Sequence, residues 1–211
     1  MHLTESNGRY FLTGVATDSH RLSSSSLEIE GANDLKPFIL PRKTVFQLCS
    51  LLIDADDELK IQTSENKIQF IYGKIRLVSK VIDGKFPDYK KVVPQKNDKS
   101  LILSSKDFID SIEKVASVSL DRKEGVKLNI NKDNVQLYVN SANSGEGNVK
   151  IRAQYDHDNL NISFNSKYLT DIASEVEDKN LKMNLKDSVS PVLIEDLSDK
   201  NSYYVIMPMK I

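Results

Sequence analysis

The feature that most constrains the fold is a weak internal repeat with an offset of about 122 to 126 residues. Two copies of one unit within 211 residues leave each copy large enough to bury a core without disulfides. The chain therefore predicts two related domains. The matching segments are FILPRKTVFQLCSLL with ISFNSKYLTDIASEV, ELKIQT with NLKMNL, and LTESNGRYFLTGV with VKLNINKDNVQLYV.

Three segments place apolar residues at the spacing of an amphipathic helix, and each has a start signal. Pro41 suits the first position of the first helix. Ser104 can cap the second helix, with Asp107 three residues on, and Asn165 can cap the third. The three apolar stripes are Val45, Leu48, Cys49 and Leu52; Phe108, Ile112 and Val115; and Leu169, Ile172, Ala173 and Val176.

Most of the remaining chain has the composition of strands separated by polar turns. The expected fold class is therefore α+β, dominated by strands. The expected strands include 59–63, 66–72, 75–82, 126–131, 134–141, 147–155 and 159–164.

The second copy opens with a strand at 101–103 and the helix at 104–117, which have no counterpart in the first copy. About 25 residues are expected to be absent there, since the offset places them before Met1. Such a gap would leave a sheet edge and an apolar helix face uncovered, so we expect the first copy to be fragile unless a partner covers it.

Composition limits the classes of function only weakly. The formal net charge of -1 excludes a uniformly basic surface but permits a local positive stripe. Cys49 is the single cysteine, so an internal disulfide is excluded. No apolar run approaches the ~20 residues of a membrane span, and residues 1–10 lack the features of a signal peptide. We expect a soluble, cytoplasmic protein.

Three motifs stand out. Residues 15–22, VATDSHRL, lie where one strand ends and another begins. Residues 83–89, DGKFPDY, form a strand exit and a turn, and lysines outnumber aspartates from there to residue 99. The C-terminal residues 203–211, YYVIMPMKI, form a strand that runs into an apolar tail, which we expect to be docked rather than mobile.

An enzyme is the weakest interpretation of these motifs. Asp18, His20 and Arg21 could form an acid–base set, but the spacing identifies neither a nucleophile nor an orienting partner. His2 and His157 have no ligand spacing relative to His20 or Cys49. We therefore expect no catalytic residue, no metal and no cofactor.

Taken together, ATDSHRL, DGKFPDY and the terminal VIMPMKI resemble the bacterial sliding clamp, the β subunit of DNA polymerase III, over essentially the whole chain. The resemblance implies the DNA-clamp fold, in which copies of a unit carry short amphipathic helices packed on antiparallel sheets. It implies that residues 1–98 form a second domain without its first strand and helix. Residues 99–211 would form the complete third domain.

The resemblance also implies a hydrophobic pocket for short peptide motifs of polymerases, the clamp loader and repair proteins. His20 and Arg21 would orient the peptide backbone at the rim, and Ser19 stands where glycine is usual. One wall would comprise Thr17, Ser19, His20, Arg21, Leu22, Pro87 and Val92. The other would comprise Tyr168, Val189, Pro191, Val205, Met207, Pro208 and Met209.

For double-stranded DNA, the resemblance implies phosphate contacts, independent of base sequence, from Arg42, Lys43, Lys90 and Lys91. Full-length clamps are homodimeric rings that pair the third domain with the neighbour's first, so this chain is not expected to close the usual ring. The expected function is a processivity factor that tethers DNA polymerase III, through its α subunit, to DNA. The alternative is a peptide-binding adaptor that does not encircle DNA.

Overall fold

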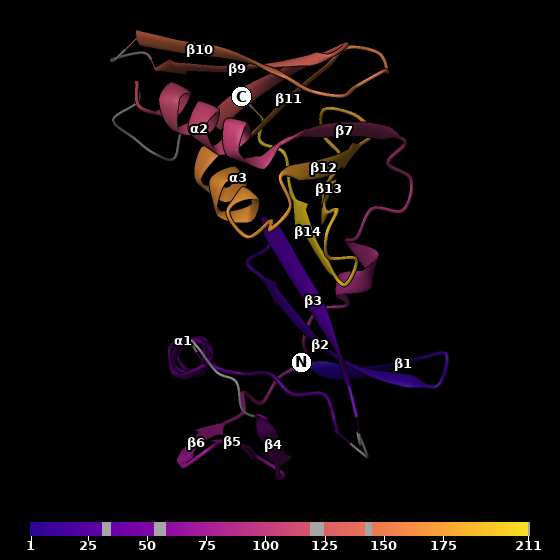
Figure 1. Ribbon diagram of the computed structural model, residues 1–211, viewed down its shortest axis with the longest axis vertical. Helices are drawn as coiled ribbons and strands as arrows, with labels where there is room; N and C mark the ends of the chain where they lie inside the picture. The colour runs from indigo at the N-terminus through magenta and orange to yellow at the C-terminus, as the bar shows by residue number, and fades with distance from the viewer. Residues whose placement is uncertain (31–34, 53–57, 119–124, 142–144, 211) are drawn as a thin grey trace. The chain divides into compact units, whose positions relative to one another are not determined.

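The computed structural model describes residues 1–30, 35–52, 58–118, 125–141 and 145–210 (Figure 1). The chain divides into two compact units. The first comprises Met1–Gly14 and Ser26–Pro87, and the second comprises Val15–Ser25 and Asp88–Ile211. Helices and antiparallel sheets occur in the chain, so the expected α+β class is confirmed.

The first unit begins with a hairpin of β1 (His2–Ser6) and β2 (Arg9–Thr17). Asn7 and Gly8 have φ angles of 52° and 74°, which is the left-handed conformation that a two-residue hairpin turn requires. The repeat segment LTESNGRYFLTGV therefore forms two strands joined by a tight turn. The remaining elements of this unit are the later part of β3 (Arg21–Ile29), α1 (Arg42–Leu51), β4 (Lys60–Thr63), β5 (Lys67–Tyr72) and β6 (Ile75–Lys80).

Strands β4, β5 and β6 form a three-stranded antiparallel sheet. Phe38, Ile68 and Phe70 are its buried core, and partly buried residues such as Leu40 and Leu48 pack against them. Among the residues of this unit that the structure describes, three buried apolar side chains make a small core.

The structure corrects two details of the first helix. Pro41 is the N-cap residue with extended backbone, so α1 begins at Arg42 instead. The predicted stripe is only partly buried, because Val45 is 43% exposed and Cys49 is also exposed, whereas Thr44 is buried. Among the described residues α1 is the only helix of the first unit, so no second helix of that unit covers this face.

The second unit contains two antiparallel sheets. The start of β3 pairs with β14 (Ser202–Ile206), which continues the sheet through β13 (Val192–Asp196), β12 (Asn180–Leu185) and β7 (Lys99–Ser104). The other sheet has the order β10 (Gly145–Arg152), β9 (Asn134–Ser141), β8 (Gly125–Asn131) and β11 (Leu160–Asn165).

Helices α2 (Ser105–Ala116) and α3 (Ser166–Ala173) lie side by side in this unit, and α2 contacts strands of both sheets (Figure 1). Both predicted caps are confirmed: the Ser104 hydroxyl accepts the Asp107 amide at 3.2 Å, and the Asn165 side chain accepts the Tyr168 amide at 3.1 Å. Each cap is worth about 1 kcal/mol. The predicted stripes of the second and third helices are buried in the core of the second unit, although Val176, the last residue of the third stripe, lies beyond the end of α3.

In the ranges that the structure describes, no helix is long and apolar enough to span a membrane.

Candidate docking site

The tip of the β2–β3 hairpin is a turn held by its own side chains. The Thr17 hydroxyl donates to the Arg21 carbonyl at 2.8 Å. The Asp18 carboxylate accepts the backbone N–H groups of His20 and Arg21 at 3.1 and 2.9 Å. Ser19 has a φ of 73°, a left-handed conformation that glycine adopts more readily. The turn therefore fixes the backbone direction of the motif at residues 17–22.

The Arg21 guanidinium joins this turn to α3. Its Nε donates to Asp18 at 3.0 Å and its Nη1 donates to Asp171 at 2.7 Å. The same guanidinium lies 4.3 Å from the centre of the Tyr168 ring, which is within cation–π range. Lys167 also donates to Asp171, at 3.1 Å. Arg21 is thus bonded to two carboxylates and stacked on an aromatic ring.

These contacts shift the pKa of each group. Burial alone would raise the pKa of Asp18 and Asp171, but the hydrogen bonds that the two carboxylates accept, including those from Arg21, outweigh burial, and both pKa values lie below normal. Burial alone would lower the pKa of Arg21, but its hydrogen bonds to the two carboxylates raise it. All three groups are therefore ionised at neutral pH. Because Asp18 is engaged in holding the turn and Arg21, the geometry gives it a structural role.

The C-terminal strand and tail lie beside this turn. Leu22 is paired with Val205 in the β3–β14 register, and the Met207 amide donates to the His20 carbonyl at 2.8 Å. The Met209 amide donates to the Ser163 carbonyl at 2.7 Å. The prediction that the tail is docked is confirmed for these residues, while Ile211 lies outside the described residues.

The loop before β13 is also held by hydrogen bonds. The Asp187 carboxylate accepts the amides of Val189 and Ser190, at 3.0 and 2.7 Å. The Pro191 carbonyl accepts the Asn97 side-chain amide at 2.9 Å. Since Val192 pairs with Ile206, the register places Pro191 next to the start of the tail. The loop therefore exposes Val189 while its backbone amide is held by Asp187.

We call the predicted site residues of the second unit other than Val92 the docking cluster. Leu22 and Val205 are buried, at 4% and 3% exposure, whereas Val189, Met207 and Met209 are exposed by 62%, 38% and 36%. Flexible, exposed thioethers can adapt to different apolar side chains. The members are Thr17, Ser19, His20, Arg21, Leu22, Tyr168, Val189, Pro191, Val205, Met207, Pro208 and Met209.

Two predicted pocket residues are left out of the docking cluster, and their part in a pocket stays a prediction. Pro87 is the last residue of the first unit, so it does not belong to the unit that carries the cluster. Val92 follows the 3-10 helix Tyr89–Lys91 and is half exposed.

The sequence motifs missed Asp171, which contacts Arg21 from 150 residues away. The only local sign that Asp171 forms an ion pair was its position one helical turn after Lys167.

The predicted DNA contacts fall into two pairs. Arg42 and Lys43 lie in the first turn of α1, where Arg42 is 5.1 Å from the centre of the Phe46 ring. Lys90 and Lys91 lie in the second unit, and Lys91 forms an exposed ion pair with Asp88 at 3.1 Å.

A hollow of about 520 Å³ lies against α1 in the first unit, and not at the docking cluster. The exposed aromatic ring and the positive charges give this hollow an apolar floor with a basic rim. Its lining residues are Arg42, Lys43, Phe46, Gln47 and Ser50.

The described residues contain no group of three or more His, Cys, Asp or Glu side chains that could hold a metal ion.

The rings of His20 and Tyr168 lie 6.3 Å apart and tilted, so they form a joint aromatic surface on the cluster. What the cluster offers chemically is apolar contact surface with a polar, ion-paired rim.

Two family models match the chain. The model of the DNA polymerase III beta subunit, central domain, matches residues 2–88, and that of the DNA polymerase III beta subunit, C-terminal domain, matches residues 90–210. The two matches meet close to the division between the compact units at Pro87 and Asp88.

Curated relatives and solved structures agree. The "Beta sliding clamp" of Caulobacter vibrioides is 33% identical over the whole chain, and that of Escherichia coli K12 is 32% identical over 99% of it. The crystal structure of a sliding clamp from Bartonella birtlesii bound to griselimycin is 38% identical, with a TM-score of 0.94. The match covers 100% of this chain and 57% of the Bartonella birtlesii chain.

The chain spans 57% of the length of these curated relatives. Both family matches fall in order and without overlap, and the C-terminal match alone covers more than half of the residues. The antiparallel sheets and paired helices described above are those of the matched clamp structures. The chain therefore belongs to the DNA polymerase III beta subunit family, the bacterial sliding clamps.

Proposed function

We propose that the chain is part of a DNA sliding clamp, the processivity factor of DNA polymerase III, and that it docks partner proteins through the docking cluster. The observation that carries this proposal is the cluster itself: an ion-paired turn is hydrogen-bonded to a tail that carries two exposed methionines. The protein would act in the cytoplasm and without catalysis. Residues 1–98 would correspond to a shortened second domain and residues 99–211 to the third.

The cluster suits a short apolar peptide. A partner's leucine and phenylalanine would contact the exposed side chains of Val189, Met207 and Met209 and displace water from them. Each fully buried side chain contributes about 1.5 to 3 kcal/mol. The proposed partners are the DNA polymerase III α subunit, the clamp loader and other proteins that carry a clamp-binding motif. The polymerase would be held on DNA by its docking to the clamp and by the topology of a closed ring around DNA.

For DNA, we propose phosphate contacts by Arg42, Lys43, Lys90 and Lys91. Such contacts follow charge and are independent of base sequence, as sliding requires. Arg42 and Lys43 stand at the N-terminus of α1, where exposed backbone N–H groups add to the positive potential.

A second candidate function is a peptide-binding adaptor that does not encircle DNA. One observation favours it: every predicted pocket residue except Pro87 belongs to the second unit, so most of the proposed peptide contacts do not require a ring.

A direct test of docking is fluorescence anisotropy with a labelled peptide of the form Gln-Leu-Ala-Leu-Phe. We expect saturable binding, and we expect Met207→Ala to weaken it about five- to tenfold by removing apolar contact. Val78→Ala, an exposed apolar residue of β6 in the first unit, is the matched control and should leave affinity unchanged. Equal affinity of the Met207→Ala variant and the unaltered chain would refute the assignment.

The two candidate functions differ in DNA binding. A clamp should bind duplex DNA with an affinity that falls with salt, and replacing Arg42 and Lys43 should reduce that salt dependence. A chain that binds the peptide but shows no such effect would support the adaptor.

A further inference from the structure

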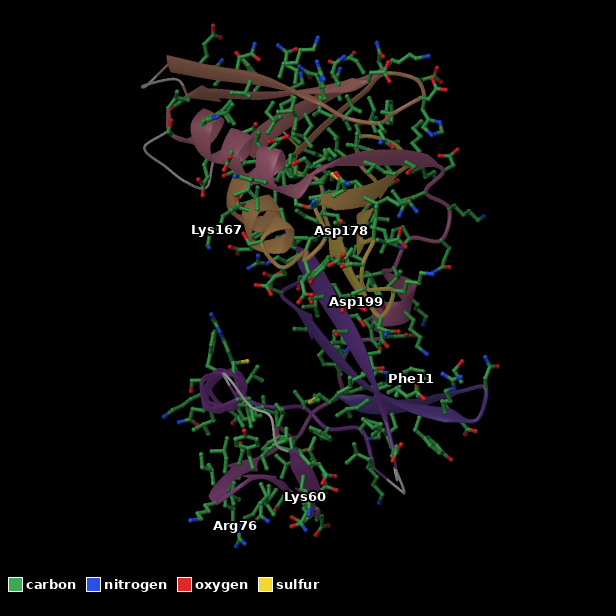
Figure 2. All side chains as sticks on the ribbon, viewed as in Figure 1. Phe11, Lys60, Arg76, Lys167, Asp178 and Asp199 are labelled. Atoms are coloured by element: carbon green, nitrogen blue, oxygen red, sulfur yellow. The ribbon has the colours of Figure 1, made fainter. Side chains whose placement is uncertain are left out.

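The rim of the docking cluster carries balanced charge. Arg21 is bonded to Asp18 and Asp171, and Asp171 is also bonded to Lys167, which Figure 2 shows on α3. The four groups carry two positive and two negative charges. Arg21 therefore brings no net charge to the rim, although its position alone would suggest an anchor for an acidic partner.

Asp171 has the central place in this arrangement. It accepts Nη1 of Arg21 at 2.7 Å and Nζ of Lys167 at 3.1 Å, each on a different carboxylate oxygen. The bond to Nη1 and the bond from Nε to Asp18 hold the guanidinium from two sides, and the Tyr168 ring lies 4.3 Å from its centre. A planar guanidinium held at two nitrogens and stacked on a ring has little freedom to turn toward a ligand.

We propose that Asp171 is a positioning and specificity-determining residue of the docking cluster: it holds Arg21 against Tyr168 and cancels its charge, so the cluster selects uncharged apolar peptides. This inference rests on the proposed docking function. With Asp171 in place, an acidic residue in the peptide brings no advantage. Without it, Arg21 keeps one carboxylate, the rim gains one positive charge, and a guanidinium nitrogen becomes available to a peptide carboxylate.

The test compares two peptides that differ in one charge, Gln-Leu-Ala-Leu-Phe and Glu-Leu-Ala-Leu-Phe. For the unaltered chain we expect their affinities to agree within about twofold. For Asp171→Asn we expect the Glu peptide to bind about three- to fivefold more tightly than the Gln peptide at low salt, with the preference fading at high salt. A preference for one peptide cannot arise from a general loosening of the fold.

Three control variants separate the causes. Asp110→Asn makes the same charge change on the exposed face of α2 and should leave the affinity ratio as in the unaltered chain. The double variant Arg21→Ala with Asp171→Asn should lose the new preference, since the preference comes from Arg21 and not from Lys167. Asp171→Glu keeps the charge and should keep the original ratio.

If Asp171→Asn weakens both peptides equally, the residue is only structural. The inference is then overturned, while docking stands as long as Met207→Ala still weakens binding. If neither peptide binds the unaltered chain, both the proposed function and the inference are overturned. Should Asp171→Asn unfold, NMR of the Arg21 Nη1–H group, which donates to Asp171, decides in the unaltered chain: a sharp, slowly exchanging signal supports the held guanidinium, and a rapidly exchanging one refutes it.

Discussion

Leu169 and Val45 occupy equivalent positions of the internal repeat, and their replacement by alanine should have very different effects. Leu169 is 1% exposed on α3, where α2 packs alongside, whereas Val45 is 43% exposed on α1. A fully buried leucine replaced by alanine loses about 2 to 5 kcal/mol of unfolding free energy, because a cavity remains. For the half-exposed valine the loss should stay below about 1 kcal/mol.

Urea unfolding followed by far-UV circular dichroism measures this difference. With a slope of about 2 kcal/mol per molar urea, Leu169→Ala should lower the midpoint of the second unit by about 1 to 2.5 M, and Val45→Ala should lower that of the first by less than about 0.5 M. Equal losses at the two positions would refute the reasoning, since they would mean that the α1 face is covered in solution.

Three further predictions concern packing, pH and salt. Gly147→Ala should destabilise the second unit by about 1 to 3 kcal/mol in thermal unfolding, because its Cβ would lie 3.0 Å from the Val115 carbonyl oxygen; Gly84→Ala, with open space around it, is the control and should not destabilise. Burial would raise the pKa of Asp196, but hydrogen bonds from Ser198 and the Glu177 amide lower it overall. The stability that Asp196 contributes is therefore present above its unfolded pKa of 3.8 and is lost as the pH falls through its lower folded pKa. Asp196→Asn should reduce the loss of unfolding free energy at acid pH, measured by urea titrations at several pH values. An unchanged loss at acid pH would contradict this role of Asp196. In DNA binding, replacing both Arg42 and Lys43 by alanine should reduce the slope of log affinity against log salt by about 2. The same double replacement at Lys60 and Lys67 tests whether this reduction in slope is specific to Arg42 and Lys43.

Local signals predicted much of the fold. The caps at Ser104 and Asn165 were predictable because a side-chain acceptor three residues before the bonded amide leaves a pattern in the sequence. The hairpin turn at Asn7 and Gly8 also has a local sequence pattern, since these two residues tolerate a positive φ.

Burial of the first helix could not be predicted in the same way. The sequence pattern of α1 and α3 is alike, but a helix face is buried only where a neighbour covers it. Leu169 has that neighbour in α2, and Val45 has no helix of its own unit beside it among the described residues. Periodicity therefore predicted the helix correctly and the burial of Val45 and Cys49 incorrectly.

The candidate site shows the same division. The hairpin turn and the tail are continuous motifs, so the sequence could single them out. The ion pair of Arg21 with Asp171 joins residues 150 positions apart, and only the fold brings them together. This pair changes the expected role of Arg21, because two of its nitrogens that could orient a peptide are bonded to carboxylates.

The most direct test of the central claim is an NMR titration of the isotope-labelled chain with the unlabelled Gln-Leu-Ala-Leu-Phe peptide. We predict saturable shifts of the backbone amides of His20, Val189 and Met207, with no shifts at Arg42, Phe46 and Gln47, which line the hollow on α1. Shifts confined to the α1 hollow, or none at the docking cluster at saturating peptide, would contradict the account.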